Sequence, residues 1–223
     1  MTTWTIPRRI IAGFIALFLI ALLLGCLSLW RVVDINENVV VMSTNSVPSV
    51  VNLNRIVQKN LVAARGVRKA MLDASDDPKS WGAAAATTEA AVKDGDALCA
   101  DYTKLMYDEK DRQLFKTASA ARDELVAVTT QGLALLRDGK VDDARTLLRG
   151  QLDTVVQDSL DRFNDCIEYN SSVAQRQVDS ARRKVRTSYL LIGAALSLAL
   201  LLASLLGGSI IRSTIRALRT VAD

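Results

Sequence analysis

The stretch VNLNRIVQKNLVAARGVRKAMLDASDDP, residues 51–78, decides the fold of this chain. From Leu53 to Leu72 its apolar residues recur at steps of three and four positions, which is the period of an amphipathic helix and not of a strand. The residues Asp-Asp-Pro at 76–78 then break the pattern, and Pro78 is well placed as the first residue of a new helix. The stretch therefore predicts a long helix that ends in a tight turn.

Three further helices follow the same pattern. The second is predicted from about Lys79 to Leu105, the third from Asp108 as its N-cap to Gly139 as its left-handed end, and the fourth from Val141. Short turns between long helices favour antiparallel neighbours. The sequence thus predicts an all-α fold, an antiparallel up-down-up-down four-helix bundle.

Proline positions suggest where helices break and where they continue. Pro48 lies inside the first helix and predicts a kink or a restart there. No proline follows Pro78, so nothing obliges the fourth helix to end before the chain becomes apolar. We expect both outer helices to continue into membrane-spanning helices.

Two stretches without a charged residue, 10–30 and 187–211, are long enough to cross a bilayer, whose hydrocarbon core of ~30 Å needs about 20 apolar residues. Trp4 and Trp30 would place one indole near each interface of the first span. The first span could instead be a lipoprotein signal peptide acylated at Cys26, but the apolar run continues past that cysteine.

Basic residues near the spans predict the orientation. The residues that precede the first span or follow the second are Arg8, Arg9, Arg212, Arg216 and Arg219. The positive-inside rule places both termini, 1–9 and 212–223, in the cytoplasm, and residues 31–186 in the periplasm of an inner-membrane, multi-pass protein. A second basic group, Arg182, Arg183, Lys184 and Arg186, opposes this orientation. It belongs to a loop far longer than the ~60 residues over which the rule applies.

The composition excludes several kinds of chemistry. The chain has 28 Lys and Arg, 24 Asp and Glu, no histidine and a net charge of +4, so it offers no Ser-His-Asp triad and no His-ligated zinc site. The acidic pairs at 76–77 and 142–143 lie at helix starts, where capping explains them. We expect no catalytic residue, no metal, no cofactor, no enzymatic activity and no nucleic-acid partner.

Cys99 and Cys166 would lie in an oxidising compartment, on the second and fourth helices. These helices are diagonal in an up-down bundle, too far apart for a disulfide, so we expect buried free thiols.

Four short stretches carry a resemblance that covers nearly the whole chain. They are STNSVPSV at 43–50, YTKL with DEKD at 102–111, LLRDGKVDDA at 135–144 and IRSTIRALR at 211–219. Together they resemble the four-helix-bundle sensor domain of methyl-accepting chemotaxis proteins, with both transmembrane helices and the start of a HAMP linker. The chain departs at Ala217, where such linkers usually have proline.

The resemblance implies a chemoreceptor. A homodimer would bind a small molecule, such as an organic or amino acid, and signal by helix displacement to a cytoplasmic HAMP and kinase-control region. Such receptors bind a kinase and an adaptor through a long coiled coil beyond the point where this chain ends, so the sequence is a truncated receptor or a sensor without that arm. Two alternatives stay open: the sensor of a histidine kinase or cyclic-dinucleotide enzyme, and a membrane-anchored structural bundle without a ligand.

A carboxylate ligand needs charge-assisted donors, which arginine supplies as a planar fork. The first helix offers Arg65, Arg68 and Lys69 at a spacing that predicts one common face, near where aspartate-receptor relatives place their arginines. The fourth helix offers three more candidates, Arg149, Gln151 and Thr154. The alternative is an ordinary solvated basic face.

Asn38, Asn45 and Asn52 recur at steps of seven along the first helix. They are either polar layers that fix the register of a dimer or ordinary polar surface.

Overall fold

The computed structural model describes residues 6–77 and 79–222, which form helices joined by short connections. This confirms the all-α prediction. Expectations on Trp4 and Pro78, and on the side chains of Arg8, Arg9, Asn38, Arg216 and Arg219, lie outside the described residues.

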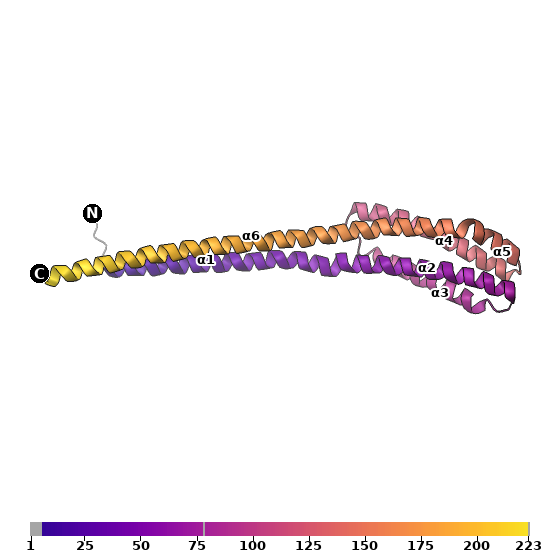
Figure 1. Cartoon of the computed structure of the whole chain (residues 1–223), viewed down its shortest axis with the longest axis horizontal. Helices are drawn as coiled ribbons and strands as arrows, with labels where there is room; N and C mark the ends of the chain where they lie inside the picture. The colour runs from indigo at the N-terminus through magenta and orange to yellow at the C-terminus, as the bar shows by residue number, and fades with distance from the viewer. Residues whose placement is uncertain (1–5, 78, 223) are drawn as a thin grey trace. The chain divides into compact units, whose positions relative to one another are not determined.

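The elements in chain order are α1 (Ile6–Val41), the π-helical η1 (Met42–Ser46), α2 (Val47–Asp76), α3 (Gly82–Tyr102), α4 (Glu109–Arg137), α5 (Val141–Leu147), the π-helical η2 (Leu148–Leu152) and α6 (Asp153–Ala222) (Figure 1).

The chain divides into two compact units, which we describe separately. Residues 40–177 form the bundle unit, and residues 1–39 with 178–223 form the two-helix unit. Helix α6 contributes residues to both.

Four antiparallel helical rods make up the bundle unit, as predicted: α2, α3, α4, and α5 with η2 and the first part of α6 (Figure 1). Polar contacts join the rods to one another. Lys59 of α2 pairs with Asp94 of α3, Arg137 of α4 pairs with Glu89 of α3, Asn170 of α6 bonds Asp111 of α4, and Asn60 of α2 bonds Ser159 of α6. Two further hydrogen bonds join α4 to α2, from Arg122 Nε to Asn60 Oδ1, and α6 to α3, from Asn170 Nδ2 to Tyr102 OH.

The ends of α3 differ from the prediction. The helix begins at Gly82 instead of Lys79, because the Asp77 carboxylate accepts a hydrogen bond from the Lys79 N–H at 3.0 Å and holds a turn there. It ends at Tyr102 instead of Leu105, whose carbonyl oxygen accepts a hydrogen bond from Asn45 Nδ2 at 2.7 Å.

Three other predictions at helix ends are confirmed. Asp108 caps α4, its Oδ1 accepting a hydrogen bond from the Asp111 N–H at 2.9 Å. Gly139 has φ of +74°, the left-handed conformation that ends a helix. The first helix restarts at Val47 with Pro48 in its first turn, directly after the wider π-helical turn of η1.

The core of the bundle unit has two parts. An aromatic cluster contains Tyr102, Phe115 and Phe163, with ring centroids 4.6 Å apart in the first pair and 6.2 Å in the second, which meets edge to face. An alanine-rich cluster fills the end near the α2–α3 turn, where Ala64, Ala84 and other small residues let the helices approach closely. Each cluster buries the apolar faces that the helical period predicted.

Between the two clusters lies a buried polar layer built on Arg122 of α4, which is 4% exposed. Its guanidinium donates to Asn60 Oδ1 at 3.2 Å, to Asp96 Oδ1 at 2.7 Å and to the Val92 carbonyl oxygen at 2.9 Å. Asn60 Nδ2 in turn donates to Ser159 Oγ at 3.1 Å, so all four rods take part. A Cβ atom at residue 95 would lie 2.5 Å from Arg122 Nη2, which explains the glycine there.

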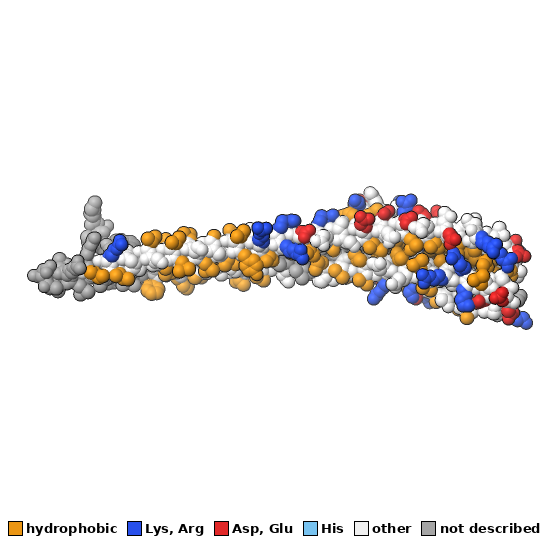
Figure 2. Space-filling model, viewed as in Figure 1, with side chains coloured by type: hydrophobic (Ala, Val, Ile, Leu, Met, Phe, Trp, Pro, Cys, Tyr) orange, Lys and Arg blue, Asp and Glu red, His pale blue; other side chains and the backbone are white. Residues whose placement is uncertain are grey.

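The two-helix unit has a different surface. In the most apolar 18-residue windows of its segment Ile11–Asp34 and of the C-terminal part of α6, the mean hydropathy is 2.7 and 2.4, and 6% and none of the residues are buried. By length and composition both could cross a membrane. Figure 2 shows apolar side chains along them with few charges, whereas the bundle unit displays charges of both signs. Lys184 Nζ lies 2.7 Å from Asp34 Oδ1 and links the two helices.

We predict that Arg122→Ala lowers the free energy of unfolding by about 2–4 kcal/mol, because it removes the partner of the buried Asn60 side-chain oxygen on α2 and of two acceptors on α3. Arg112→Ala is the matched control on the same helix, since its exposed pair with Glu109 is worth less than about 1 kcal/mol. Denaturant unfolding of both variants measures the difference, and equal stabilities would contradict the role of the layer.

Candidate ligand-binding groove

A groove of about 310 Å³ runs between α2 and α3 at the end of the bundle near the α2–α3 turn. Arg65, Lys69 and Val62 line its α2 side, and Ala83 and Thr87 line its α3 side. The apolar walls come from small residues, and the polar groups sit on both helices. A ligand here would touch two neighbouring rods at once.

Arg65 is exposed and makes no hydrogen bond or ion pair with any residue that the structure describes. All five N–H groups of its guanidinium are therefore available. Lys69, one turn on, places its Nζ 2.9 Å from both carboxylate oxygens of Asp73, in an exposed pair of small energetic value. The Thr87 hydroxyl donates to the Ala83 carbonyl oxygen at 2.9 Å, so its oxygen can still accept a hydrogen bond. The groove thus offers two cations and one acceptor.

The structure does not bring the three basic residues of α2 to one face. Arg68 points to the other side of the helix, where its Nη2 lies 2.5 Å from Asp153 Oδ1 of α6. Successive helical residues are rotated by about 100°, so Lys69 lies about 40° to one side of Arg65 and Arg68 about 60° to the other. That difference is enough to direct Lys69 toward α3 and Arg68 toward α6.

The second set of predicted residues lies apart from the groove. Arg149 and Gln151 belong to η2 and Thr154 to the first turn of α6, and all three are exposed. None of them lines the α2–α3 groove. The ligand-binding role of all six residues stays a prediction, and the groove contains only Arg65 and Lys69 of the six.

The connection between α3 and α4 holds a second polar cluster that the sequence analysis did not find. The buried carboxylate of Asp111 accepts hydrogen bonds from Tyr102 OH at 2.6 Å, from Asn170 Nδ2 at 2.9 Å and from the Tyr107 N–H at 3.0 Å. Beside it, Tyr169 OH donates to Asp108. The cluster fastens the α3–α4 connection to α6.

Hydrogen bonding and burial shift the pKa values of Asp108, Tyr169 and Tyr102 away from neutral pH. The bond from Tyr169 lowers the pKa of Asp108 and, from the other side, raises the pKa of Tyr169 to about 12. Burial and the bond to Asp111 raise the pKa of Tyr102. These shifts fit a structural fastening and not a group that exchanges protons in a reaction.

Two asparagines of the predicted seven-residue repeat fall in described parts of the bundle. Asn45 donates to the Leu105 carbonyl oxygen, as does Ser49 Oγ at 3.4 Å. The side-chain oxygens of Asn45 and Asn52 are buried and have no hydrogen-bond partner among the residues that the structure describes. Asn45 therefore makes a hydrogen bond within its own chain, and the role of the asparagine repeat in a dimer stays a prediction.

The thiols agree with the sequence prediction in part. Cys99 of α3 and Cys166 of α6 are both free, but only Cys166 is fully buried and Cys99 is partly exposed. Burial raises the pKa of Cys99 to about 11 and that of Cys166 to about 12, so both are protonated and weakly reactive at neutral pH. Across residues 6–77 and 79–222, no cluster of carboxylates and thiols could hold a metal ion.

The all-α bundle is the fold of a helical sensory module. The sequence profile of the "Four helix bundle sensory module for signal transduction" matches residues 3–185, and the chain belongs to this family. A presumed sensory transducer protein of Acetivibrio thermocellus is 25% identical over 106 residues, which cover 48% of this chain and 19% of that protein. The matched part is thus about a fifth of the length of that relative. No solved structure matches the chain.

Proposed function

We propose that this chain is the sensor region of a transmembrane chemoreceptor that binds a small carboxylate in the α2–α3 groove. The observation that carries the proposal is the unpaired Arg65 guanidinium, which stands at the edge of an apolar groove beside a second cation. A planar guanidinium matches the two oxygens of a carboxylate. Thr87, with its free acceptor, would suit the ammonium of an amino acid.

The proposed topology keeps the sequence-based division. Residues 10–30 and 187–211 would cross the inner membrane, 31–186 would form the periplasmic sensor, and 1–9 and 212–223 would be cytoplasmic, the latter opening a HAMP linker. Two long apolar helices and the membership of a sensory family support this placement. The positive-inside rule supplies the orientation.

A second copy of the chain is the proposed partner. One face of α2 carries large apolar side chains that are 38–56% exposed: Val47, Val51, Val62 and Leu72. At about 100° per residue these four positions fall within about 80° of one another around the helix, so they form one stripe that a second helix could cover. Arg65 and Lys69 continue the same stripe, so the groove would border the interface of a homodimer.

Signalling would follow from the links that join α2 and the preceding turn η1 to α6. Arg68 pairs with Asp153, Asn60 bonds Ser159, and Ser46 Oγ donates to Gln177 Oε1 at 2.9 Å. A ligand that pulls α2 toward α3 would act on all three links and favour a position of α6 displaced by about 1–2 Å. The ligand must bind one position more tightly than the other, since equal binding changes no population. A cytoplasmic kinase and adaptor would receive the signal, and the chain itself would catalyse no reaction.

Calorimetric titration of the full chain with acetate, succinate, aspartate and benzoate tests the ligand class. We expect at least one of them to bind, and Arg65→Ala to weaken its binding by about tenfold or more, because a charge-assisted pair is lost. Arg55→Ala is the control: an exposed arginine of the same helix outside the groove. Equal affinities of the two variants would refute the site, and no binding by any acid would favour a structural bundle.

The proposed dimer has its own test. Val51→Glu with Leu72→Glu should convert the full chain in detergent from dimer to monomer in sedimentation, because four charges per dimer would face each other in the interface. Ala90→Glu with Ala127→Glu adds the same charges to exposed positions of α3 and α4 and should leave the dimer intact. A wild-type chain that sediments as a monomer would exclude this interface.

A further inference from the structure

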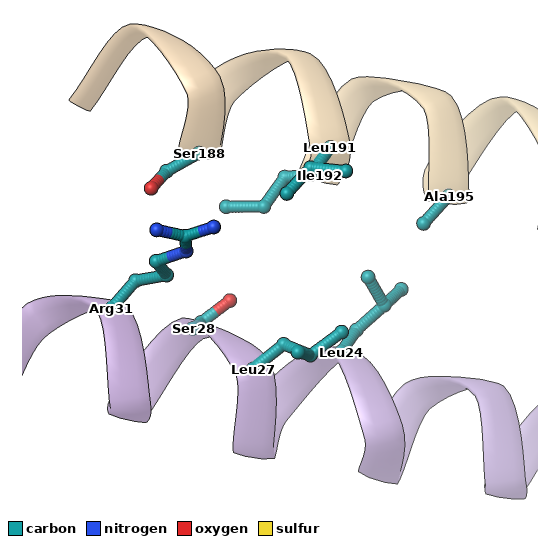
Figure 3. Close-up of a pocket in the computed structure, with 8 residues that line it drawn as sticks. All are labelled: Leu24, Leu27, Ser28, Arg31, Ser188, Leu191, Ile192 and Ala195. Atoms are coloured by element: carbon teal, nitrogen blue, oxygen red, sulfur yellow. The ribbon is translucent and has the colours of Figure 1, made fainter. Parts of the chain in front are cut away.

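A cavity of about 250 Å³ lies between α1 and α6 within the two-helix unit. Each helix contributes residues at steps of three and four, so the cavity follows one face of each (Figure 3). Leu24, Leu191 and Ala195 line its apolar part. The polar end is lined by Ser28, Arg31 and Ser188.

The polar end of the cavity has an excess of positive charge. Arg31 contacts the ring of Trp30, 5.4 Å from its centroid, and pairs with no acidic residue in the described part of the chain. One turn further on, Asp34 is engaged by Lys184. Arg182, Arg183 and Arg186 are exposed on the same stretch of α6. These residues belong to the basic group at 182–186 that opposes the orientation predicted by the positive-inside rule, and the predicted topology gives that group no role.

The surroundings are those of a membrane interface. Trp30 and Tyr189 are 62% and 74% exposed at the ends of the apolar segments, where aromatic residues sit at headgroup level. An arginine at this depth extends toward phosphate groups. In a bilayer, the apolar part of the cavity would be surrounded by lipid acyl chains, which are the most abundant molecules available to fill it.

We propose that this cavity binds one anionic phospholipid, with the phosphate on the Arg31 guanidinium and the Ser28 hydroxyl, and with one acyl chain against Leu24, Leu191 and Ala195. The Ser188 hydroxyl takes no part as a donor, because it donates to the Lys184 carbonyl oxygen at 2.8 Å. Charge selects the headgroup: a zwitterionic lipid would bring its ammonium toward Arg182 and Arg186, whereas an anionic headgroup is attracted to them.

The lipid proposal rests on α1 and α6 crossing a membrane, as proposed above. It depends neither on their orientation in the membrane nor on ligand binding in the α2–α3 groove. Carboxylate titration and lipid binding are separate measurements, so the failure of one proposal can be told from the failure of the other.

Native mass spectrometry of the full chain, purified in detergent with equal amounts of phosphatidylglycerol and phosphatidylcholine, tests it. We expect one retained phosphatidylglycerol per chain and a preference over phosphatidylcholine. Arg31→Gln should reduce the retained lipid by about tenfold, as expected for the loss of a charge-assisted bond. Arg55→Gln removes the same charge from α2 and should change nothing.

A second variant, Ala195→Leu, places a larger side chain where the acyl chain would lie while it keeps every charge, and it should also weaken lipid binding. Equal retention of both lipids, or equal effects of Arg31→Gln and Arg55→Gln, would overturn the proposal. So would an efficient disulfide between two copies of an Ala195→Cys variant in which Cys26, Cys99 and Cys166 are replaced by serine, because a second helix would then occupy the cavity.

Discussion

The buried guanidinium of Arg122 needs hydrogen-bond partners, and the bundle is arranged to supply them. Its hydrogen bonds are accepted by Asn60, Asp96 and the Val92 carbonyl oxygen, and Asn60 in turn donates a hydrogen bond to Ser159. A charged group in a helical core is costly unless every donor is paired, so the layer tolerates little sliding of one rod along another. The aromatic cluster on one side and the alanine-rich cluster on the other then pack in a fixed register.

Polar groups at the ends of the bundle join different pairs of rods. At the α3–α4 connection, Asp111 binds α4 to α6, and Asn45 binds the connection to η1. At the opposite end the contacts are exposed ion pairs such as Arg68 with Asp153, which are weak and can rearrange. A sensor needs both properties, because a ligand can move only an element whose alternative position costs a few kcal/mol at most. The proposed groove lies at the more adaptable end, where α2 faces α3 through small residues and an unpaired Arg65.

Much of the fold could be predicted from the sequence, because helical periodicity, the Asp108 cap and the left-handed Gly139 are local signals. The limits of α3 could not, since they depend on Asp77 and Asn45 reaching residues outside the helical pattern. The candidate site was harder to predict from the sequence than the fold. Spacing alone placed Arg65, Arg68 and Lys69 together, but 100° per residue sends Arg68 toward α6 and Lys69 toward α3. Arg122 occupied a core position in the helical pattern, and that conflict was a signal that the sequence analysis passed over.

The central claim is that a carboxylate in the α2–α3 groove displaces α6 relative to α2. Spin labels at exposed Asn54 of α2 and Glu168 of α6, in a chain with its three cysteines replaced, measure this by pulsed electron resonance. Saturation with the carboxylate that binds in titration should change the mean distance by about 1–2 Å. The same addition to the Arg65→Ala variant should change nothing. An unchanged distance in the wild-type background with the ligand bound would contradict the account.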